Sequence, residues 1–460
     1  MICGPKSSGK STFAHLLTNR LLSVETEKSN SSKVSQPGVA LLDLDPGQPE
    51  YSIPGQLSLV HIQEPNFSPP FAHPIPGPKS RVVRAHTIAS ITPAQDTDLY
   101  MACAIDLFAH YRNLLSTTPN CPLVINTSGW VLGTGLELLT DLIAKIHPTD
   151  IIYMSQEGPW DVVKSLKEAA KSTPVYTLPS QTSEYTTRTA AHLRTMQTMS
   201  YFHLDPKSKD NLVWNDTPLT AIPPWEIKYS GESAGILGII CYGEQPPADL
   251  LFDSINGSLV AVVVIDDMAA IPGWNSDEPD TMHDNSDPIP SPGVQNDTQT
   301  LQNPLLIRTP ISDLPYFNPF NSISLLPQHS HCVGMALVRG IDIPRRRLQV
   351  LTPISPGIIE EASEQGKNIV LVSGKFDTPG WAYTEDMVKT SVLEKEGKKQ
   401  GDEEGSDEEM DGDENVTEVG KEHSFTNVPW VERLEGSQGR GVGARVWRVR
   451  RDLGKSDSGD

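Results

Sequence analysis

Residues 1–12, "MICGPKSSGKST", decide the fold expected of this chain. From Gly4 they match the pattern G-x-x-x-x-G-K-[ST], which is typical of a phosphate-binding loop between a strand and a helix. In such a loop backbone N–H groups face the phosphates, the lysine reaches the β- and γ-phosphates, and the hydroxyl residue holds Mg²⁺. The predicted nucleotide-binding residues are Gly4, Pro5, Lys6, Ser7, Ser8, Gly9, Lys10, Ser11 and Thr12, with Lys10 also catalytic and Ser11 also a metal ligand.

The strand before this loop is unusually short. Only residues 1–3 precede Gly4, whereas a typical strand has about five or six residues. A strand that carries a phosphate loop is normally central in a parallel sheet, so its loss would weaken pairing and core burial. We therefore expect the loop to be real and the sequence to be a fragment or truncated gene product.

Composition limits the class of protein. The 460 residues are 37% hydrophobic and contain no apolar run near the roughly 20 residues of a membrane span. The five cysteines are scattered without a CxxC pair, which argues against both a disulfide framework and a structural zinc site. The net charge is −21, and residues 401–414 alone carry nine acids. Any nucleic-acid site is therefore a local basic cleft.

The pattern of apolar segments divides the chain. Residues 1–205 alternate short apolar strands with amphipathic helices, which predicts an α/β domain with a mostly parallel, doubly wound sheet. Residues 206–390 contain several short strands and predict a smaller β-rich domain. The other predicted segments are a disordered insertion at 272–304, an acidic disordered linker at 391–427, and a C-terminal stretch at 428–460 that packs on the second domain.

Two carboxylates end the strand in "GVALLDLDPGQPE". Alternation places Asp43 and Asp45 on one side of the strand, at the edge where ligands bind in open α/β sheets. One carboxylate can hold Mg²⁺, and the other can accept a proton from an attacking hydroxyl. We select Asp43 as the metal ligand. The alternative is a turn cap, since Asp-Pro-Gly is good turn chemistry.

A tryptophan between glycines follows another strand, in "VINTSGWVLGTG". Tryptophan is more often part of a core than of a binding surface. Trp130, however, comes after the carboxyl end of a buried strand and looks exposed. Its ring is therefore a candidate platform for a nucleobase, and such stacking is worth about 1–3 kcal/mol.

Taken in order, "GPKSSGKS", "DLDPGQ", "TP..D", "NTSGW..GTG..LL" and "R.....R......YF" resemble the eukaryotic polynucleotide 5′-hydroxyl kinases. "LDPGQPEYSIPGQLSL" and "VWRVRRDL" are more similar to the branch that processes pre-ribosomal RNA. The resemblance covers most of residues 1–205. It implies that Asp45 is the general base, that Gln48, Thr92, Asp96 and Trp130 bind the substrate, and that Arg188 and Arg194 belong to a catalytic lid.

The two lid arginines raise a geometric difficulty. A spacing of six residues separates Arg188 and Arg194 by about 120° on a continuous helix. They cannot both face one point without a bend. The alternative for both is a solvated helix surface.

The resemblance also implies a biological setting. It predicts ATP and Mg²⁺ as cofactors, RNA with a 5′-hydroxyl end as substrate, and an endoribonuclease partner in pre-ribosomal-RNA processing, specifically removal of the internal transcribed spacer. It implies a nuclear and nucleolar location, with no membrane partner. Members of the family carry a β-rich domain before the phosphate loop, which we do not find in this sequence.

Three alternatives compete with this function. A GTPase is disfavoured because no Asn-Lys-x-Asp occurs in the chain. A non-catalytic ATP-binding scaffold subunit of an RNA-cleavage complex is compatible with the motifs, since a scaffold can keep Lys10 without turnover. A small-molecule kinase would accept a nucleoside as readily as an oligonucleotide.

Overall fold

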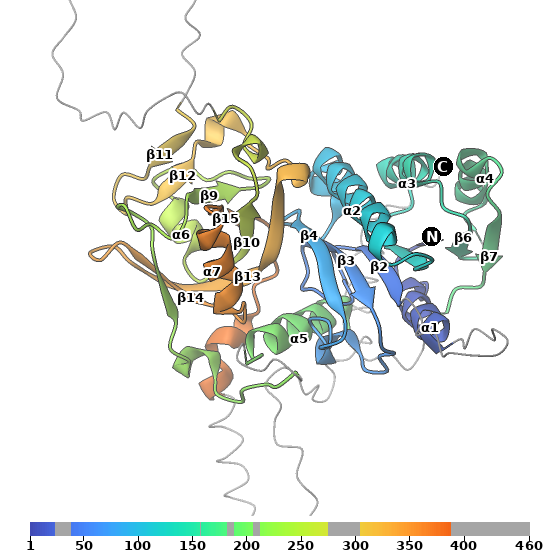
Figure 1. The fold of residues 1–460 in the computed structure, drawn as a ribbon, viewed down its shortest axis with the longest axis horizontal. Helices are drawn as coiled ribbons and strands as arrows, with labels where there is room; N and C mark the ends of the chain where they lie inside the picture. The colour runs from blue at the N-terminus through green and yellow to red at the C-terminus, as the bar shows by residue number, and fades with distance from the viewer. Residues whose placement is uncertain (24–37, 157, 182–187, 206–211, 275–303, 388–460) are drawn as a thin grey trace, which may run out of the picture.

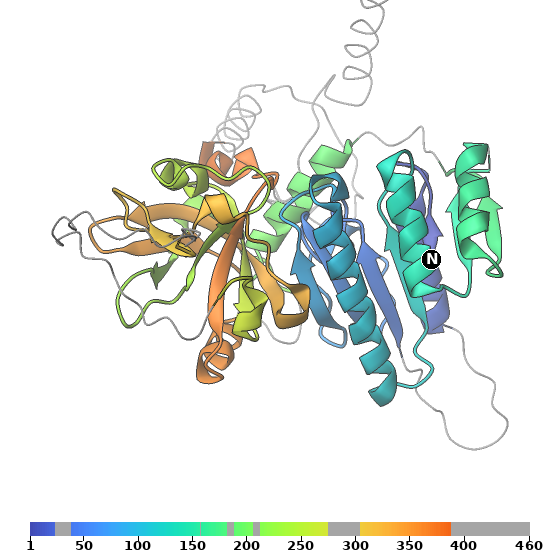
Figure 2. The ribbon, with the colours of Figure 1, turned by 90° about the horizontal axis from the view of Figure 1, so that it is seen from above.

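The structure is a computed structural model that describes residues 1–23, 38–156, 158–181, 188–205, 212–274 and 304–387. Two β-sheets lie side by side in it (Figures 1 and 2). The predicted insertion at 272–304 falls, apart from its ends, outside the described residues. The predicted linker at 391–427 and the terminal segment at 428–460 also lie outside them.

The first sheet has seven strands in the order β4-β3-β2-β5-β1-β6-β7. Strands β2, β5, β1, β6 and β7 are parallel, and β3 and β4 extend the sheet by antiparallel pairing. The α/β class with a mostly parallel sheet is thus confirmed. The strands are β1 (Ile2–Cys3), β2 (Val39–Leu44), β3 (Gln56–Ile62), β4 (Arg81–Thr87), β5 (Leu123–Thr127), β6 (Ile151–Met154) and β7 (Val175–Leu178).

Helices cover both faces of this sheet. Helices α2, α3 and α4 lie on one face and α1 lies on the other (Figure 1). Leu41 of β2 faces α1, whereas Leu42 and Leu44 face the opposite layer. By the same alternation Asp43 lies on the α1 side. The helices are α1 (Lys10–Ser23), α2 (Thr97–Thr117), α3 (Thr134–Ile146), α4 (Trp160–Ala170) and α5 (Ala190–Phe202).

The second sheet has eight strands in the order β11-β12-β9-β15-β10-β13-β14-β8. Its pairings are antiparallel except for those of β9, which is parallel to β12 and β15. The prediction of a second, β-rich domain is confirmed. Its elements are β8 (Trp225–Lys228), β9 (Gly238–Cys241), α6 (Leu251–Ile255), β10 (Leu259–Ile265), β11 (Leu306–Arg308), β12 (Pro315–Phe317), β13 (Ser330–Asp342), β14 (Arg347–Leu351), α7 (Pro356–Glu364) and β15 (Asn368–Ser373).

A largely buried arginine joins the two sheets. Arg84 of β4 donates to Asp266 Oδ2 at 3.0 Å and to the carbonyls of Pro327 and Ser330 at 3.0 and 2.8 Å. Its Nε also lies 3.6 Å from Asp106 Oδ2 on α2. These contacts tie the edge of the first sheet to the second domain. Among the described residues, no helix combines the length and apolar character that crossing a membrane requires.

Candidate active site

The phosphate loop leaves β1 in a conformation that favours glycine. Gly4 has φ +146°, and a Cβ there would lie 3.0 Å from the carbonyl oxygen of Met154. Gly9 has φ +94° and Ser7 has φ +63°, so the chain curls before α1 begins at Lys10. Such a curl directs successive backbone N–H groups inward, which makes an anion-binding concavity at the start of a helix.

Two neighbouring segments close around this loop. The backbone N–H of Gln181, after β7, donates to the Ser8 carbonyl at 3.0 Å. After β5, a Cβ on Gly129 would lie 2.8 Å from Lys6 Cα. Inside the loop, the buried Ser8 hydroxyl has no hydrogen-bond partner. An unpartnered hydroxyl in an enclosed loop is suited to a phosphate oxygen.

The side chain of Lys10 is turned back onto the loop. It is only 5% exposed, and its Nζ donates to the Pro5 carbonyl at 3.0 Å. Burial lowers the pKa of Lys10, and the nearby Asp45 carboxylate opposes that shift. Thr12, by contrast, is exposed on α1.

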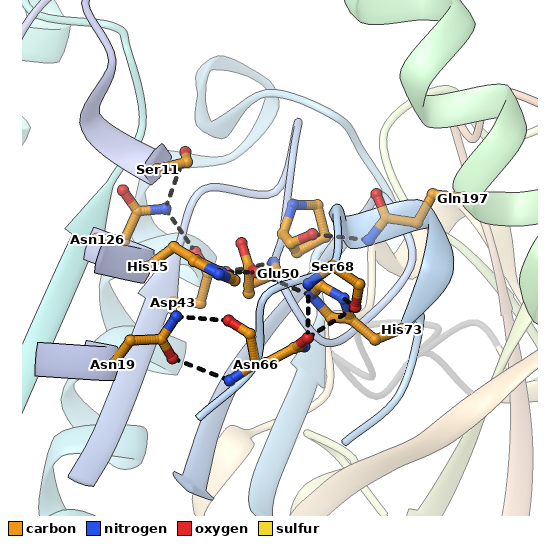
Figure 3. A network of polar contacts seen from close by, with 11 residues as sticks. Ser11, His15, Asn19, Asp43, Glu50, Asn66, Ser68, His73, Asn126 and Gln197 are labelled. Atoms are coloured by element: carbon orange, nitrogen blue, oxygen red, sulfur yellow. Dashed lines mark hydrogen bonds and ion pairs between the residues drawn. The ribbon is translucent and has the colours of Figure 1, made fainter. Parts of the chain in front are cut away.

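An asparagine on β5 bridges the phosphate loop and the carboxylates of β2. In the sheet register Asn126 is paired with Asp43 on one side and with Ile2 on the other. Asn126 Nδ2 donates to Asp43 Oδ1 at 3.0 Å and lies 3.5 Å from Ser11 Oγ (Figure 3). Three elements far apart in sequence therefore meet at the carboxyl edge of the sheet.

These three side chains fit a magnesium ion. The Nδ2 group of Asn126 faces the Ser11 hydroxyl and the Asp43 carboxylate, and its Oδ1 atom is buried without a hydrogen-bond partner. A half-turn of the amide would bring Oδ1 to the side of Ser11 and Asp43. Such hard oxygen atoms are the ligands Mg²⁺ prefers. Burial raises the pKa of Asp43 to about 7. A cation at this place would favour the ionised carboxylate and lower that pKa.

Asp45 lies two residues after Asp43, just beyond the end of β2. It is half-buried, and its Oδ1 accepts from the Gly47 N–H at 3.0 Å. Burial raises the pKa of Asp45, and the positive charge of Lys10 opposes this. A hydrogen bond to the backbone of Gln48 also steadies the carboxylate. The carboxylate of Asp45 is therefore both held in place and close to the charge of the phosphate-loop lysine.

Thr92 and Asp96, two of the predicted substrate-binding residues, both cap helical turns. Thr92 Oγ1 accepts from the Ala94 N–H at 3.3 Å, and Asp96 Oδ1 accepts from the Leu99 N–H at 2.9 Å at the start of α2. A Cβ on Gly47 would lie 3.0 Å from the Ile91 carbonyl oxygen, so this segment adjoins the loop after Asp45. Thr92 and Asp96 thus border the candidate site, and their substrate role stays a prediction.

Trp130 is half-buried rather than exposed. Its ring covers the start of α3, because a Cβ on Gly135 would lie 2.6 Å from Trp130 Cγ. Only glycine therefore fits at position 135, the second glycine of "GTG", because any side chain there would collide with the indole ring. Gly129 places this segment against Lys6, so Trp130 adjoins the phosphate loop.

The two lid arginines differ in their surroundings. Helix α5 begins at Ala190, so Arg188 lies before it and the 120° separation of a continuous helix does not apply to the pair. Arg194 is on α5, and its Nε contacts Asp377 Oδ2 of the second domain at 2.7 Å. Arg188 Nη1 is buried without a hydrogen-bond partner. Their lid role stays a prediction.

Two further residues, Asn126 and Gln197, organise the site without being among the predicted site residues. Asn126 ends the predicted strand "PLVIN", and its place at a strand end was the available signal. Gln197 of α5 donates to the carbonyls of Pro49 and Ser52, both at 2.7 Å, and so anchors α5 on the loop that follows β2. Nothing in the sequence around Gln197 indicates this contact.

The fold and this edge of the sheet define a phosphate-loop nucleotide-binding domain. Residues 4–204 match the family described as the "mRNA cleavage and polyadenylation factor CLP1 P-loop". The resemblance to polynucleotide 5′-hydroxyl kinases is confirmed by the relatives of the whole chain.

Those relatives are fungal proteins. The chain is 41% identical over 481 residues to the "Polynucleotide 5′-hydroxyl-kinase GRC3" of Gibberella zeae, covering 100% of this chain and 61% of that protein. It is 38% identical over 500 residues to the protein of the same name from Aspergillus oryzae, covering 100% of this chain and 60% of the relative. The chain therefore spans about three fifths of the length of these relatives. A solved Clp1p–Pcf11p complex matches 81% of this chain and 73% of its own, with a TM-score of 0.46 and 15% identity.

Proposed function

We propose that the protein is an ATP-dependent polynucleotide 5′-hydroxyl kinase that transfers the γ-phosphate to the 5′-hydroxyl end of RNA. One observation carries the proposal. Asn126 links Ser11 of the phosphate loop to Asp43, two residues before Asp45. Phosphoryl transfer depends on positioning and charge neutralisation, and this edge of the sheet provides groups for both.

Each group has a distinct role in the proposed reaction. The loop N–H groups and Lys10 bind and orient the β- and γ-phosphates, for which the Lys10 ammonium leaves the Pro5 carbonyl. Ser11, Asp43 and Asn126 would hold Mg²⁺, which when bound neutralises charge on the phosphates. Asp45 accepts the proton of the attacking 5′-hydroxyl. Because burial raises its pKa, Asp45 is a stronger base than an exposed carboxylate.

The biological setting is the finer part of the proposal. We place the chain in pre-ribosomal-RNA processing, at the removal of the internal transcribed spacer, with an endoribonuclease partner whose cleavage leaves a 5′-hydroxyl. Its location would be the nucleus and nucleolus. The support is the sequence resemblance and the kinase name of the fungal relatives.

A non-catalytic ATP-binding scaffold is the second candidate. The observation in its favour is that two cations assigned to the phosphates have partners within the protein. Lys10 contacts the Pro5 carbonyl and Arg194 contacts Asp377. A scaffold would bind ATP in this arrangement without phosphoryl transfer.

A comparison of acceptors tests the proposal. We expect γ-phosphate transfer to an oligoribonucleotide with a free 5′-hydroxyl, and much weaker transfer to a nucleoside at equal hydroxyl concentration. An oligodeoxynucleotide of the same sequence measures the preference for RNA. ATP binding with transfer to none of the three supports the scaffold, and equal transfer to nucleoside and oligonucleotide supports a small-molecule kinase.

Trp130→Ala is expected to weaken binding of the oligonucleotide more than binding of ATP. Loss of one stacked base costs about 1–3 kcal/mol, so KM for the oligonucleotide should rise by roughly 5- to 150-fold while KM for ATP changes little. Steady-state kinetics measure both constants. Trp160→Ala is the matched control, because Trp160 is 69% exposed on α4 of the same domain. If Trp130→Ala instead unfolds the protein, the indole is part of the hydrophobic core and not a platform for a base.

A further inference from the structure

A cluster of two histidines and a glutamate lies beside the candidate active site. His15 Nδ1 is 2.6 Å and His73 Nε2 is 2.8 Å from Glu50 Oε1 (Figure 3). The three ligand atoms lie within 4.8 Å of one another. His15 is on α1, Glu50 is in the loop between β2 and β3, and His73 follows a 3₁₀ turn at Pro70–Ala72. The proposed kinase reaction uses none of the three.

We propose that His15, Glu50 and His73 form a zinc site. Two imidazole nitrogens and one carboxylate oxygen are a recurrent three-ligand set for Zn²⁺. Imidazole ligands favour zinc and neighbouring transition metals over Mg²⁺, which prefers oxygen. The site is therefore chemically distinct from the oxygen-rich set of Ser11, Asp43 and Asn126 nearby.

Hydrogen bonding around His73 prepares its Nε2 as a ligand. Ser68 Oγ lies 3.0 Å from His73 Nδ1 and 2.7 Å from Asn66 Oδ1. Asn66 Oδ1 only accepts, so Ser68 donates its single proton there. His73 must then donate from Nδ1 to Ser68, which leaves Nε2 with either a second proton or a metal ion. Such an outer chain is what fixes the tautomer of a metal-binding histidine.

The acidic member of the cluster is held in its charged form. Burial favours the neutral acid, but hydrogen bonds with His15 and His73 outweigh this and lower the pKa of Glu50. The hydrogen bond with Glu50 raises the pKa of His15. Glu50 Oε1 faces a ring nitrogen of each histidine, so a divalent cation between them would contact all three side chains.

A second, independent observation concerns the pocket on one side of the cluster. His15, Glu50 and Thr18 line this pocket, which also reaches Ser11, Asp43 and Asn126 of the proposed magnesium site. Thr18 is 4% exposed, and its Oγ1 has no hydrogen-bond partner. Three protein ligands leave the fourth zinc position to a water molecule. A metal-bound water directed into this pocket would give the Thr18 hydroxyl a partner.

The cluster needs little movement to accept the ion. In a tetrahedral site with bonds of about 2.0–2.1 Å the ligand atoms stand roughly 3.3 Å apart. The histidine nitrogens must therefore move away from Glu50 Oε1 by about 0.5–0.7 Å. They must also come to about 3.3 Å from each other, starting from a separation of at most 4.8 Å.

Zinc at this place would stabilise the edge of the active site. It would fasten α1, which begins in the phosphate loop, to two segments that flank β3. The backbone N–H of Glu50 donates to Asp43 Oδ2 at 2.7 Å. The same ion would therefore also restrain the loop that positions Asp43.

A metal titration of the whole chain without nucleotide or Mg²⁺ tests the proposal. In chelator-buffered Zn²⁺ we expect one ion per chain and a rise in Tm. Replacement of Zn²⁺ by Co²⁺ should give the visible absorption of a four-coordinate ion. His15→Gln and His73→Gln should each lose more affinity than the ~10–100-fold typical of an outer partner, and Ser68→Ala should lose about that amount. His147→Asn is the control, because His147 is exposed and its left-handed backbone tolerates Asn.

The outcomes separate a built site from adventitious binding. Stoichiometric Zn²⁺ binding that is lost in both ligand variants and kept in His147→Asn supports the site. Circular dichroism of each variant verifies folding, and His15→Gln keeps the test valid if replacement of buried His73 prevents folding. An absence of Zn²⁺ binding by the wild type, or equal binding by wild type and folded His15→Gln, would overturn the proposal.

Discussion

Asp45→Asn is expected to lower the rate of γ-phosphate transfer by about 10²–10⁴-fold, the usual contribution of a general base. The amide still accepts hydrogen bonds from the Gly47 and Gln48 backbone, so the loop should keep its shape. Nucleotide affinity should change little, because Asp45 does not belong to the phosphate loop. Transfer kinetics and ATP titration of the same preparation measure the two effects.

The control for this substitution is Asp141→Asn on α3. Asp141 is exposed, so loss of its charge should leave the transfer rate unchanged. Lys10→Ala is expected to differ from Asp45→Asn by weakening ATP binding as well as transfer. Normal turnover by Asp45→Asn would contradict the assignment of the base and direct attention to Asp43.

Arg84→Met is expected to destabilise the protein by about 3–5 kcal/mol, the cost of removing one partner from a buried ion pair. The substitution leaves Asp106 on α2 and Asp266 after β10 without their shared cation. Asp266 keeps contacts with His331 and Lys367, so the loss should centre on the junction of the two sheets. Urea denaturation measures the change in free energy of unfolding.

Arg81→Met provides the matched control, since Arg81 is exposed on the same strand. It should change the free energy of unfolding by less than about 0.5 kcal/mol, as is usual for a surface position. The combination of Arg84→Met with Asp266→Asn should recover part of the stability. Equal urea midpoints for Arg84→Met and Arg81→Met would show that Arg84 does not join the sheets.

The sequence predicts those helices and strands whose apolar residues recur with a regular local spacing. Amphipathic patterns at residues 134–146 and 160–170 predict two helices, and α3 and α4 have these bounds. Strand β3 was missed because "QLSLVHI" follows a run rich in turn residues. Its polar residues Gln56, Ser58 and His61 are buried together with its apolar ones, so the mixed sequence does not indicate a fully buried strand. As a result the antiparallel edge formed by β3 and β4 was not predicted.

The candidate site was predicted only where each motif is contiguous. The phosphate loop and the pair Asp43 and Asp45 each lie in one short stretch. Asn126 becomes significant only through the parallel register, which aligns it with Asp43 across two strands. The histidine cluster joins positions 35 and 23 residues apart, and no local pattern reports such a meeting.

Transfer of a radiolabelled γ-phosphate tests the central claim most directly. The purified chain is incubated with labelled ATP, Mg²⁺ and two oligoribonucleotides of identical sequence, one ending in a 5′-hydroxyl and the other in a 5′-phosphate. The account predicts label on the first oligonucleotide, none on the second, and loss of the signal in Asp45→Asn. ATP binding by a folded chain without label on the 5′-hydroxyl oligonucleotide, or equal label on both, would contradict it.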